Sequence, residues 1–96
     1  MTNAALAPET RVRISPSVYA RAFGAEIVLL DFGRGEYFGL DAIGAEIWRR
    51  LESGEALGAI ADALVQHYEV SREDAYRDTL LLVESMRNES LLSVAC

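Results

Sequence analysis

Apolar residues follow two different periods along this chain, and the change near Leu40 divides it into two parts. Before Leu40, β-forming residues stand in short runs separated by turns at Gly24-Ala25 and Gly33-Arg34-Gly35, where glycine permits a tight reversal. The runs predict three strands, Val18–Phe23, Glu26–Phe32 and Glu36–Leu40. Because the turns are short, we expect the strands to pair in order as a three-stranded antiparallel sheet.

After Leu40 the apolar residues recur at helical spacing. Asp41 follows the third strand directly and suits a helix N-cap, because its carboxylate can accept from the free N–H groups of the first turn. Ser71, with Asp74 three residues later, is a second N-cap. Three helices are expected, Ala42–Leu51, about Glu55–Tyr68, and Ser71 to about Asn88. Strands followed by helices predict an α+β fold with the helices on one face of the sheet.

The apolar side of each helix is expected to face the core. These sides contain Ile43, Ile47, Trp48 and Leu51 in the first helix, Leu57, Ile60, Ala61, Leu64, Val65 and Tyr68 in the second, and Ala75, Thr79, Leu82, Val83 and Met86 in the third. We interpret Trp48 as a packing residue of the core.

The third helix carries more apolar residues than one core-facing side can hold. Leu80–Val83 is a run of four, and consecutive positions on a helix differ by about 100°. Leu82 is assigned to the core and Leu81 to a flank, so Leu82→Asp is expected to unfold the domain and Leu81→Asp to spare the fold. Two interpretations of Leu81 stay open, a scattered exposed side chain or one wall of a groove.

The third strand is an edge of the expected sheet without the usual protection. Tyr37-Phe38-Gly39-Leu40 contains neither proline nor charge, the residues that commonly guard an edge strand. Phe38 and Leu40 share one face, and Tyr37 points to the other. Such an edge can template a partner strand from another peptide or pair with a second copy, which would give a homodimer.

Length, charge and cysteine content exclude several classes of protein. The 96 residues form one domain, expected at residues 11–92 between a loose tail at 1–10 and a frayed end at 93–96. A net charge of −6 disfavours nucleic acid and anionic lipid as partners. Cys96 is the only cysteine, so no internal disulfide is expected. With no apparent signal peptide or membrane span, we expect a cytoplasmic protein.

No pattern of chemistry-bearing residues indicates catalysis. His67 is the single histidine, interpreted as a solvated helix residue, and no spacing suits a metal ion. We therefore expect no catalytic residue, no metal site and no cofactor.

The junction of the third strand and first helix carries a family resemblance. Leu40, Asp41, Gly44 and Ile47-Trp48 resemble the PqqD pattern, roughly Tyr-x-Leu-Asn-x-x-Gly-x-x-Ile-Trp, with Phe38 in the place of Tyr. The resemblance extends from about Val18 to Leu92, and departs again at Asn88–Ser90, where the family often has glycine. It implies a winged helix-turn-helix-like module that captures the leader segment of a ribosomally made precursor peptide.

In that family the leader adds as a strand beside the third strand and against the third helix. Asp78 matches an aspartate common in the family's third helix, and would pair with a polar or basic leader group unless it is simply a solvated acid. The resemblance implies a leader peptidase, cyclase or radical-type modifying enzyme as a partner, with lasso peptide maturation favoured over pyrroloquinoline quinone and other pathways. The implied peptide-binding residues are Glu36, Tyr37, Phe38, Gly39, Leu40, Asp78, Leu81, Leu82 and Ser85.

A winged-helix DNA-binding domain is the alternative. Its recognition helix would be Ser71–Asn88, which holds Arg72, Arg77 and Arg87 but a larger number of acidic residues. A net acidic helix repels phosphate, so this alternative is disfavoured.

Overall fold

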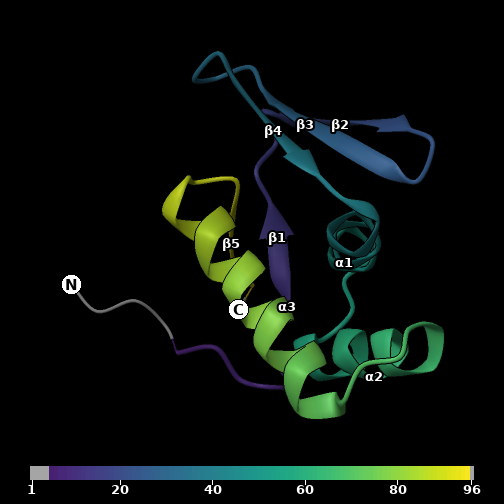
Figure 1. The fold of residues 1–96 in the computed structure, drawn as a ribbon. Coiled ribbons are helices and arrows are strands. Elements are labelled where there is room, and N and C mark those ends of the chain that lie inside the picture. The colour runs from purple at the N-terminus through teal and green to yellow at the C-terminus, as the bar shows by residue number, and fades with distance from the viewer. Residues whose placement is uncertain (1–4, 96) are drawn as a thin grey trace.

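The computed structural model describes residues 5–95 and has the α+β architecture that the sequence predicts (Figure 1). A three-stranded sheet lies at one end of the molecule, with helix α1 and the C-terminal end of α3 beneath it and helix α2 at the far end. In chain order the elements are β1 (Val12–Ile14), β2 (Val18–Phe23), β3 (Glu26–Asp31), β4 (Glu36–Leu40), α1 (Ala42–Glu52), α2 (Leu57–His67), α3 (Arg72–Asn88) and β5 (Leu92–Val94).

The main sheet has the order β2-β3-β4 and is antiparallel throughout. Gly24, the first residue of the two-residue turn between β2 and β3, has a φ of 63°, which glycine adopts without strain. Ile27 and Leu29 alternate with exposed or half-buried residues and are buried on the face that meets α1. Their partners on β4, Leu40 and Phe38, lie on the same face, as predicted.

Backbone hydrogen bonds show which groups of the sheet lack a partner strand. The N–H of Phe32 donates to the Ser17 carbonyl at 3.0 Å, so even-numbered residues of β3 face β2. The odd-numbered ones, Ile27, Leu29 and Asp31, therefore face β4 and pair with Leu40, Phe38 and Glu36. It follows that Tyr37 and Gly39 direct their N–H and C=O groups away from β3, toward the free edge of the sheet.

Asp41 makes the predicted junction between β4 and α1. Its Oδ1 accepts from the Gly44 N–H at 2.8 Å, a capping bond that satisfies a first-turn donor. A Cβ at position 44 would lie 3.3 Å from this Oδ1 and 3.4 Å from the Leu40 Cβ. Glycine at position 44 thus lets the cap and the end of the strand pack closely, which fixes the angle between β4 and α1.

The chain ends are more ordered than the sequence suggests. Strand β5 pairs antiparallel with β1, with Ser93 opposite Arg13 and Val94 opposite Val12, so the expected frayed end from residue 93 is wrong for these two residues. Buried Leu91 and Leu92 hold the returning chain against the core. Cys96 lies outside the described residues.

The N-terminal segment before β1 is also held in place. Helix α2 begins after Ala56, which has no capping side chain, so its first N–H groups need other acceptors. The Leu57 N–H donates to the Thr10 carbonyl at 2.9 Å, and the Gly58 N–H to the Pro8 carbonyl at 2.7 Å. The prediction of a loose tail is therefore wrong for residues 8–10, and residues 1–4 lie outside the described part.

The core contains most, but not all, of the expected side chains. Trp48 is fully buried, which confirms its interpretation as a packing residue. Ile43 and Val65, assigned to apolar sides, are 40% and 37% exposed. Leu82 is only partly buried, because the core side of α3 is centred on other residues, namely Ala75, Thr79, Val83 and Met86. The prediction that Leu82 lies in the core stripe is thus wrong.

A small cluster of charges links α1 to α2. His67 is not merely solvated, since its Nδ1 lies 2.7 Å from Glu46 Oε2, and the Arg50 Nε donates to the same oxygen at 3.1 Å. Burial alone would raise the pKa of Glu46, but the hydrogen bonds from His67 and Arg50 outweigh it and lower the pKa below the ordinary value.

The variant Glu46→Gln is expected to flatten the acid side of the stability profile. A carboxyl whose folded-state pKa is lowered stabilises the fold above its unfolded-state pKa, near 4.5, and loses this contribution as pH falls through the folded-state value. The variant should be about 0.5–1 kcal/mol less stable at pH 7, with the difference vanishing toward pH 3. Urea unfolding at both pH values measures this, and a difference that persists at pH 3 would contradict the assignment.

Candidate functional site: a groove between an edge strand and a helix

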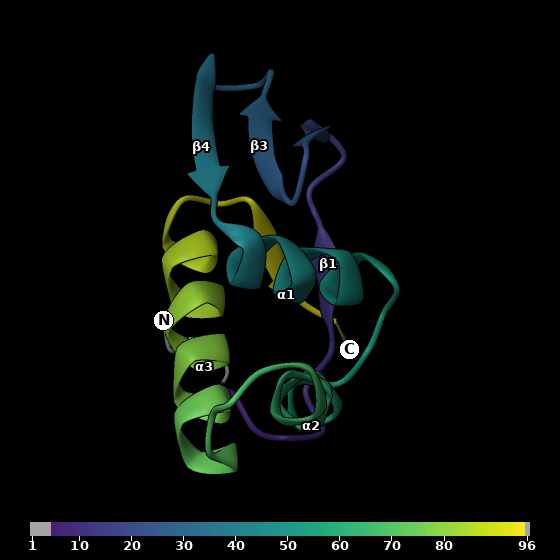
Figure 2. The same ribbon diagram turned by 45° about the vertical axis from the view of Figure 1, so that its right-hand side comes forward.

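The end of β4 and the start of α1 together form one wall of an apolar groove whose other wall is α3. Figure 2 shows β4 above the C-terminal end of α3, with α1 beside both. A hollow of about 280 Å³ is lined by Leu29, Phe38, Gly39, Leu40, Leu82, Ser85, Met86, Glu89 and Leu91. A second hollow of about 240 Å³, lined by Asp41, Ile43, Gly44, Ile47, Asp78 and Leu82, shares Leu82 with the first. We call the two together the β4–α3 groove.

The helix contributes a single stripe to this groove. Asp78, Leu82, Ser85 and Glu89 recur at spacings of four, three and four, and therefore lie above one another on one face of α3. Leu81 lies about 60° around the helix from Asp78, on the side away from the core. Its side chain is 61% exposed and is not among the lining residues of either hollow.

The groove is apolar along its length and acidic near its ends. Phe38 and Leu82 are half-buried in its middle, packed against the core with one side open. Its carboxylates are Asp41 and Asp78 at one hollow and Glu89 at the other, and no basic side chain is among the lining residues. Since the Asp41 carboxylate accepts the capping bond, Asp78 and Glu89 are the acids with more freedom to meet a ligand. The groove therefore suits an extended apolar segment with basic or hydrogen-bond-donating groups.

Arg34 joins the two walls at one end. It lies in the turn between β3 and β4, and its Nη1 donates to the carbonyl of Glu89 at 2.8 Å, at the end of α3. Its Nε lies 3.0 Å from Glu36 Oε1, which holds the guanidinium beside the strand. The turn is itself pinned by buried Asp31, whose Oδ1 accepts from the Gly33 N–H at 3.0 Å. Arg34 thus links the turn between β3 and β4 to the end of α3 at this end of the groove.

The structure brings together most of the residues that the sequence nominated for peptide binding. Phe38, Gly39, Leu40, Leu82 and Ser85 line the first hollow, and Asp78 lines the second. Glu36 and Tyr37 belong to the same edge strand outside the hollows, and Leu81 lies on the outer rim of α3. The hollows are also lined by residues that were not nominated, and Arg34 lies at one end of the groove. These further lining residues are Leu29, Asp41, Ile43, Gly44, Ile47, Met86, Glu89 and Leu91.

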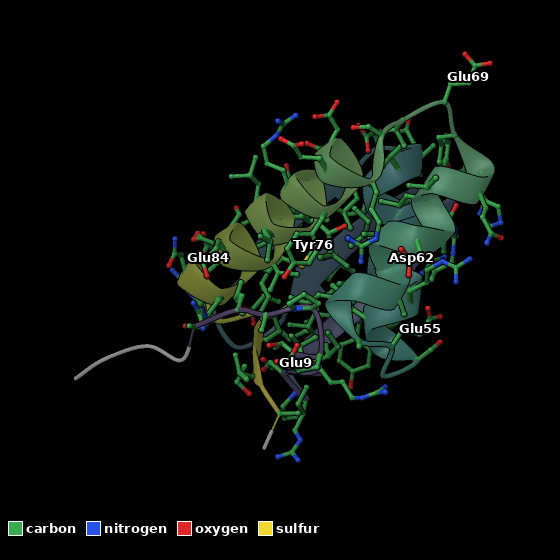
Figure 3. The ribbon with its side chains drawn as sticks, turned by 90° about the horizontal axis from the view of Figure 1, so that it is seen from below. Glu9, Glu55, Asp62, Glu69, Tyr76 and Glu84 are labelled. Carbon is green, nitrogen blue, oxygen red and sulfur yellow. The ribbon has the colours of Figure 1, made fainter. Side chains whose placement is uncertain are left out.

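The carboxylates elsewhere are dispersed. Seen from below in Figure 3, Glu55, Asp62, Glu69 and Glu84 lie apart on the helices and their connections. Among residues 5–95, no group of three or more His, Cys, Asp or Glu side chains could hold a metal ion. Within the same part of the chain, no helix has the length and hydropathy to cross a bilayer.

This combination of fold and groove defines a small α+β domain with a strand edge and an apolar cleft side by side. A family model described as "Coenzyme PQQ synthesis protein D (PqqD)" matches residues 26–92. The chain belongs to the PqqD family, as the strand–helix junction suggested.

Two solved structures are similar to the chain over most of its length. One, "TbiB1 in Complex with the TbiA(beta) Leader Peptide", is 39% identical, with a TM-score of 0.79, and the match covers 83% of this chain and 93% of the other. The second, "Lasso peptide synthetase B1 complexed with the leader peptide", is 34% identical, with a TM-score of 0.80, and the match covers 85% and 96% of the two chains. The search of curated proteins found no match.

Proposed function

We propose that the chain binds the leader segment of a ribosomally made precursor peptide and presents it to a lasso peptide processing enzyme. The observation that carries this proposal is the outward-facing backbone of Tyr37 and Gly39 beside the β4–α3 groove. An added strand would bond to these four groups while alternate side chains enter the groove. The similarity to two leader-peptide complexes supports the same ligand class.

Within this proposal the groove residues have distinct roles. Phe38 and Leu82 would pack against apolar leader side chains, and Asp78 would pair with a polar or basic group at the rim. Leu40 and Ser85 complete the wall around the apolar middle. The protein would do no chemistry itself, but raise the effective concentration of the leader near the enzyme, which can reach millimolar when a tether is short.

The alternative of DNA binding is not supported. Each arginine of α3 has a carboxylate partner, since Arg72 lies 2.5 Å from Asp62, Arg77 2.9 Å from Asp74, and Arg87 2.5 Å from Glu84. Neutralising phosphate would require these pairs to be broken. The helix therefore offers no free basic face for a duplex.

Reconstitution tests the proposed function directly. A candidate precursor, a candidate leader peptidase and this protein are mixed, and each is then omitted in turn. We expect cleavage at micromolar precursor to need the peptidase and to be accelerated by this protein. Cleavage by this protein and precursor alone, or equal rates with and without it, would contradict the proposal.

Arg34→Ala is expected to weaken leader binding about three- to fivefold with little loss of stability. Its ion pair with Glu36 is about half-exposed, and such pairs contribute about 0–1 kcal/mol to folding. Without the bond to the Glu89 carbonyl, this end of the groove would be free to widen. The leader would then have to fix the groove end in place when it binds, which costs conformational entropy and lowers the affinity. Fluorescence titration of a labelled leader and thermal melting measure the two effects. Unchanged affinity would show that Arg34 does not set the groove width.

A further inference from the structure

The face of the main sheet that turns away from α1 carries a concentration of aromatic side chains. We call it the outer face. Tyr19, Phe23, Phe32 and Tyr37, half of the eight aromatic residues of the chain, are 59%, 59%, 68% and 75% exposed. Single exposed apolar residues are ordinary, but a contiguous group on one face is typical of an interaction site.

The strand register places these residues in rows. Tyr19 of β2 pairs with Leu30 of β3, which pairs with Tyr37 of β4, so one apolar row crosses all three strands. The Phe32 ring meets the Tyr19 ring edge-on, with centroids 5.1 Å apart, and extends the row at one end. The neighbouring row is Arg21, Val28 and Gly39, in which glycine leaves a low point.

No helix covers this face. In Figure 1 the helices all lie on the other side of the sheet, and β2 is exposed along almost its whole length. A hollow of about 450 Å³, lined in part by Phe23, Val28 and Gly39, lies beside the rows. The hollow also contacts Glu26, Ile27, Leu40 and Asp41, so it lies at the end of the sheet where β4 leads into α1. The outer face therefore combines projecting rings with one cation, Arg21, and one carboxylate, Glu26, beside this hollow.

The row is continuous with the edge where the leader is proposed to add. Tyr37 belongs to β4, so a strand paired with that edge would place its own outward side chain beside Tyr37 and extend the row to a fourth strand. A protein that touches both the outer face and the bound leader would meet them at the same strand.

We infer that the outer face docks the enzyme that acts on the leader-bearing precursor, through an apolar surface of that enzyme with a carboxylate placed for Arg21. This inference rests on the proposed function. Tyrosine and arginine are enriched among the anchors of protein interfaces, and both stand here in one patch. Because the bound leader completes the surface, leader and enzyme raise each other's affinity by the same factor.

The test uses the full chain with a double variant, Tyr19→Ser with Phe32→Ser, since both residues lie away from the β4 edge. Val65→Ser is the matched control, because Val65 is exposed on α2, away from the sheet. A candidate leader peptidase serves as the probe. Leader affinity is measured by fluorescence, and peptidase affinity by the concentration that gives half-maximal cleavage.

The double variant is expected to bind leader within twofold of the parent, but to need about tenfold more peptidase. Arg21→Glu should also raise the peptidase concentration needed for half-maximal cleavage, and Val65→Ser should leave that concentration unchanged. A double variant that melts normally, binds leader and needs no extra peptidase would overturn the inference. So would sedimentation showing a parent dimer that the double variant abolishes, since the occupant would then be a second copy. Failure of the parent itself to bind leader would instead contradict the proposed function.

Discussion

Gly39→Pro is expected to reduce leader affinity at least about tenfold while Gly39→Ala leaves it unchanged. The Gly39 N–H faces the free edge, so proline removes a donor offered to the leader without removing a bond to β3. A leader carbonyl left without its partner costs about 1–3 kcal/mol. A Cβ at position 39 meets nothing within 4 Å, so alanine fits and keeps the N–H. The pair of variants thus separates the backbone bond from the side chain.

Titration of labelled leader against both variants measures this difference, with thermal melting as the check on folding. Phe38, the residue before the new proline, is already extended, as a residue in that position prefers to be. Equal affinity of Gly39→Pro and Gly39→Ala would mean that the leader does not pair with β4.

Leu82→Ala is expected to weaken leader binding about tenfold, whereas Leu81→Ala changes it less than twofold. Leu82 lies at the junction of the two hollows, where a buried leader side chain would contact it. Leu81 is 61% exposed on the rim. Because Leu82 is only half-buried, its truncation should cost about 1–2 kcal/mol of stability, less than the 2–5 kcal/mol of a fully buried leucine.

The affinities and the urea unfolding curves of both variants test this assignment. The sequence alone predicts that Leu81→Asp weakens leader binding with little loss of stability and that Leu82→Asp unfolds the domain. The exposure of Leu81 agrees with a spared fold, but the groove is lined by Leu82 and not by Leu81, so the expected effect on binding moves to position 82. If Leu81→Ala loses more affinity than Leu82→Ala, the leader contacts the outer rim of α3 and not the groove.

The sequence predicted those features that depend on local signals. The strands of the main sheet are bounded by glycine turns, and Asp41 and Ser71 cap helices through bonds to residues three positions later. These signals act within a few residues, so they can be read without knowledge of the partner elements. These local signals were enough to predict both the edge strand β4 and the helix α3 that form the site.

Features that depend on distant partners were not predictable in the same way. Strands β1 and β5 have three residues each and are far apart in sequence, so neither shows a period of its own. The bond from Arg34 to Glu89 likewise joins residues 55 positions apart. Periodicity placed Leu82 in the core stripe, but only the packing of β4 and α1 shows that its half-buried side chain lines the groove.

Hydrogen exchange of individual amides, with and without leader, tests the central claim most directly. Phe38 and Leu40 already donate within the sheet, whereas the Tyr37 and Gly39 amides face its free edge. We predict that leader binding slows exchange at Tyr37 and Gly39 specifically, with smaller effects on β2. Protection at Ala20 and Ala22, which face the opposite edge, or unchanged exchange at Tyr37 and Gly39 in saturated protein, would contradict strand addition at β4.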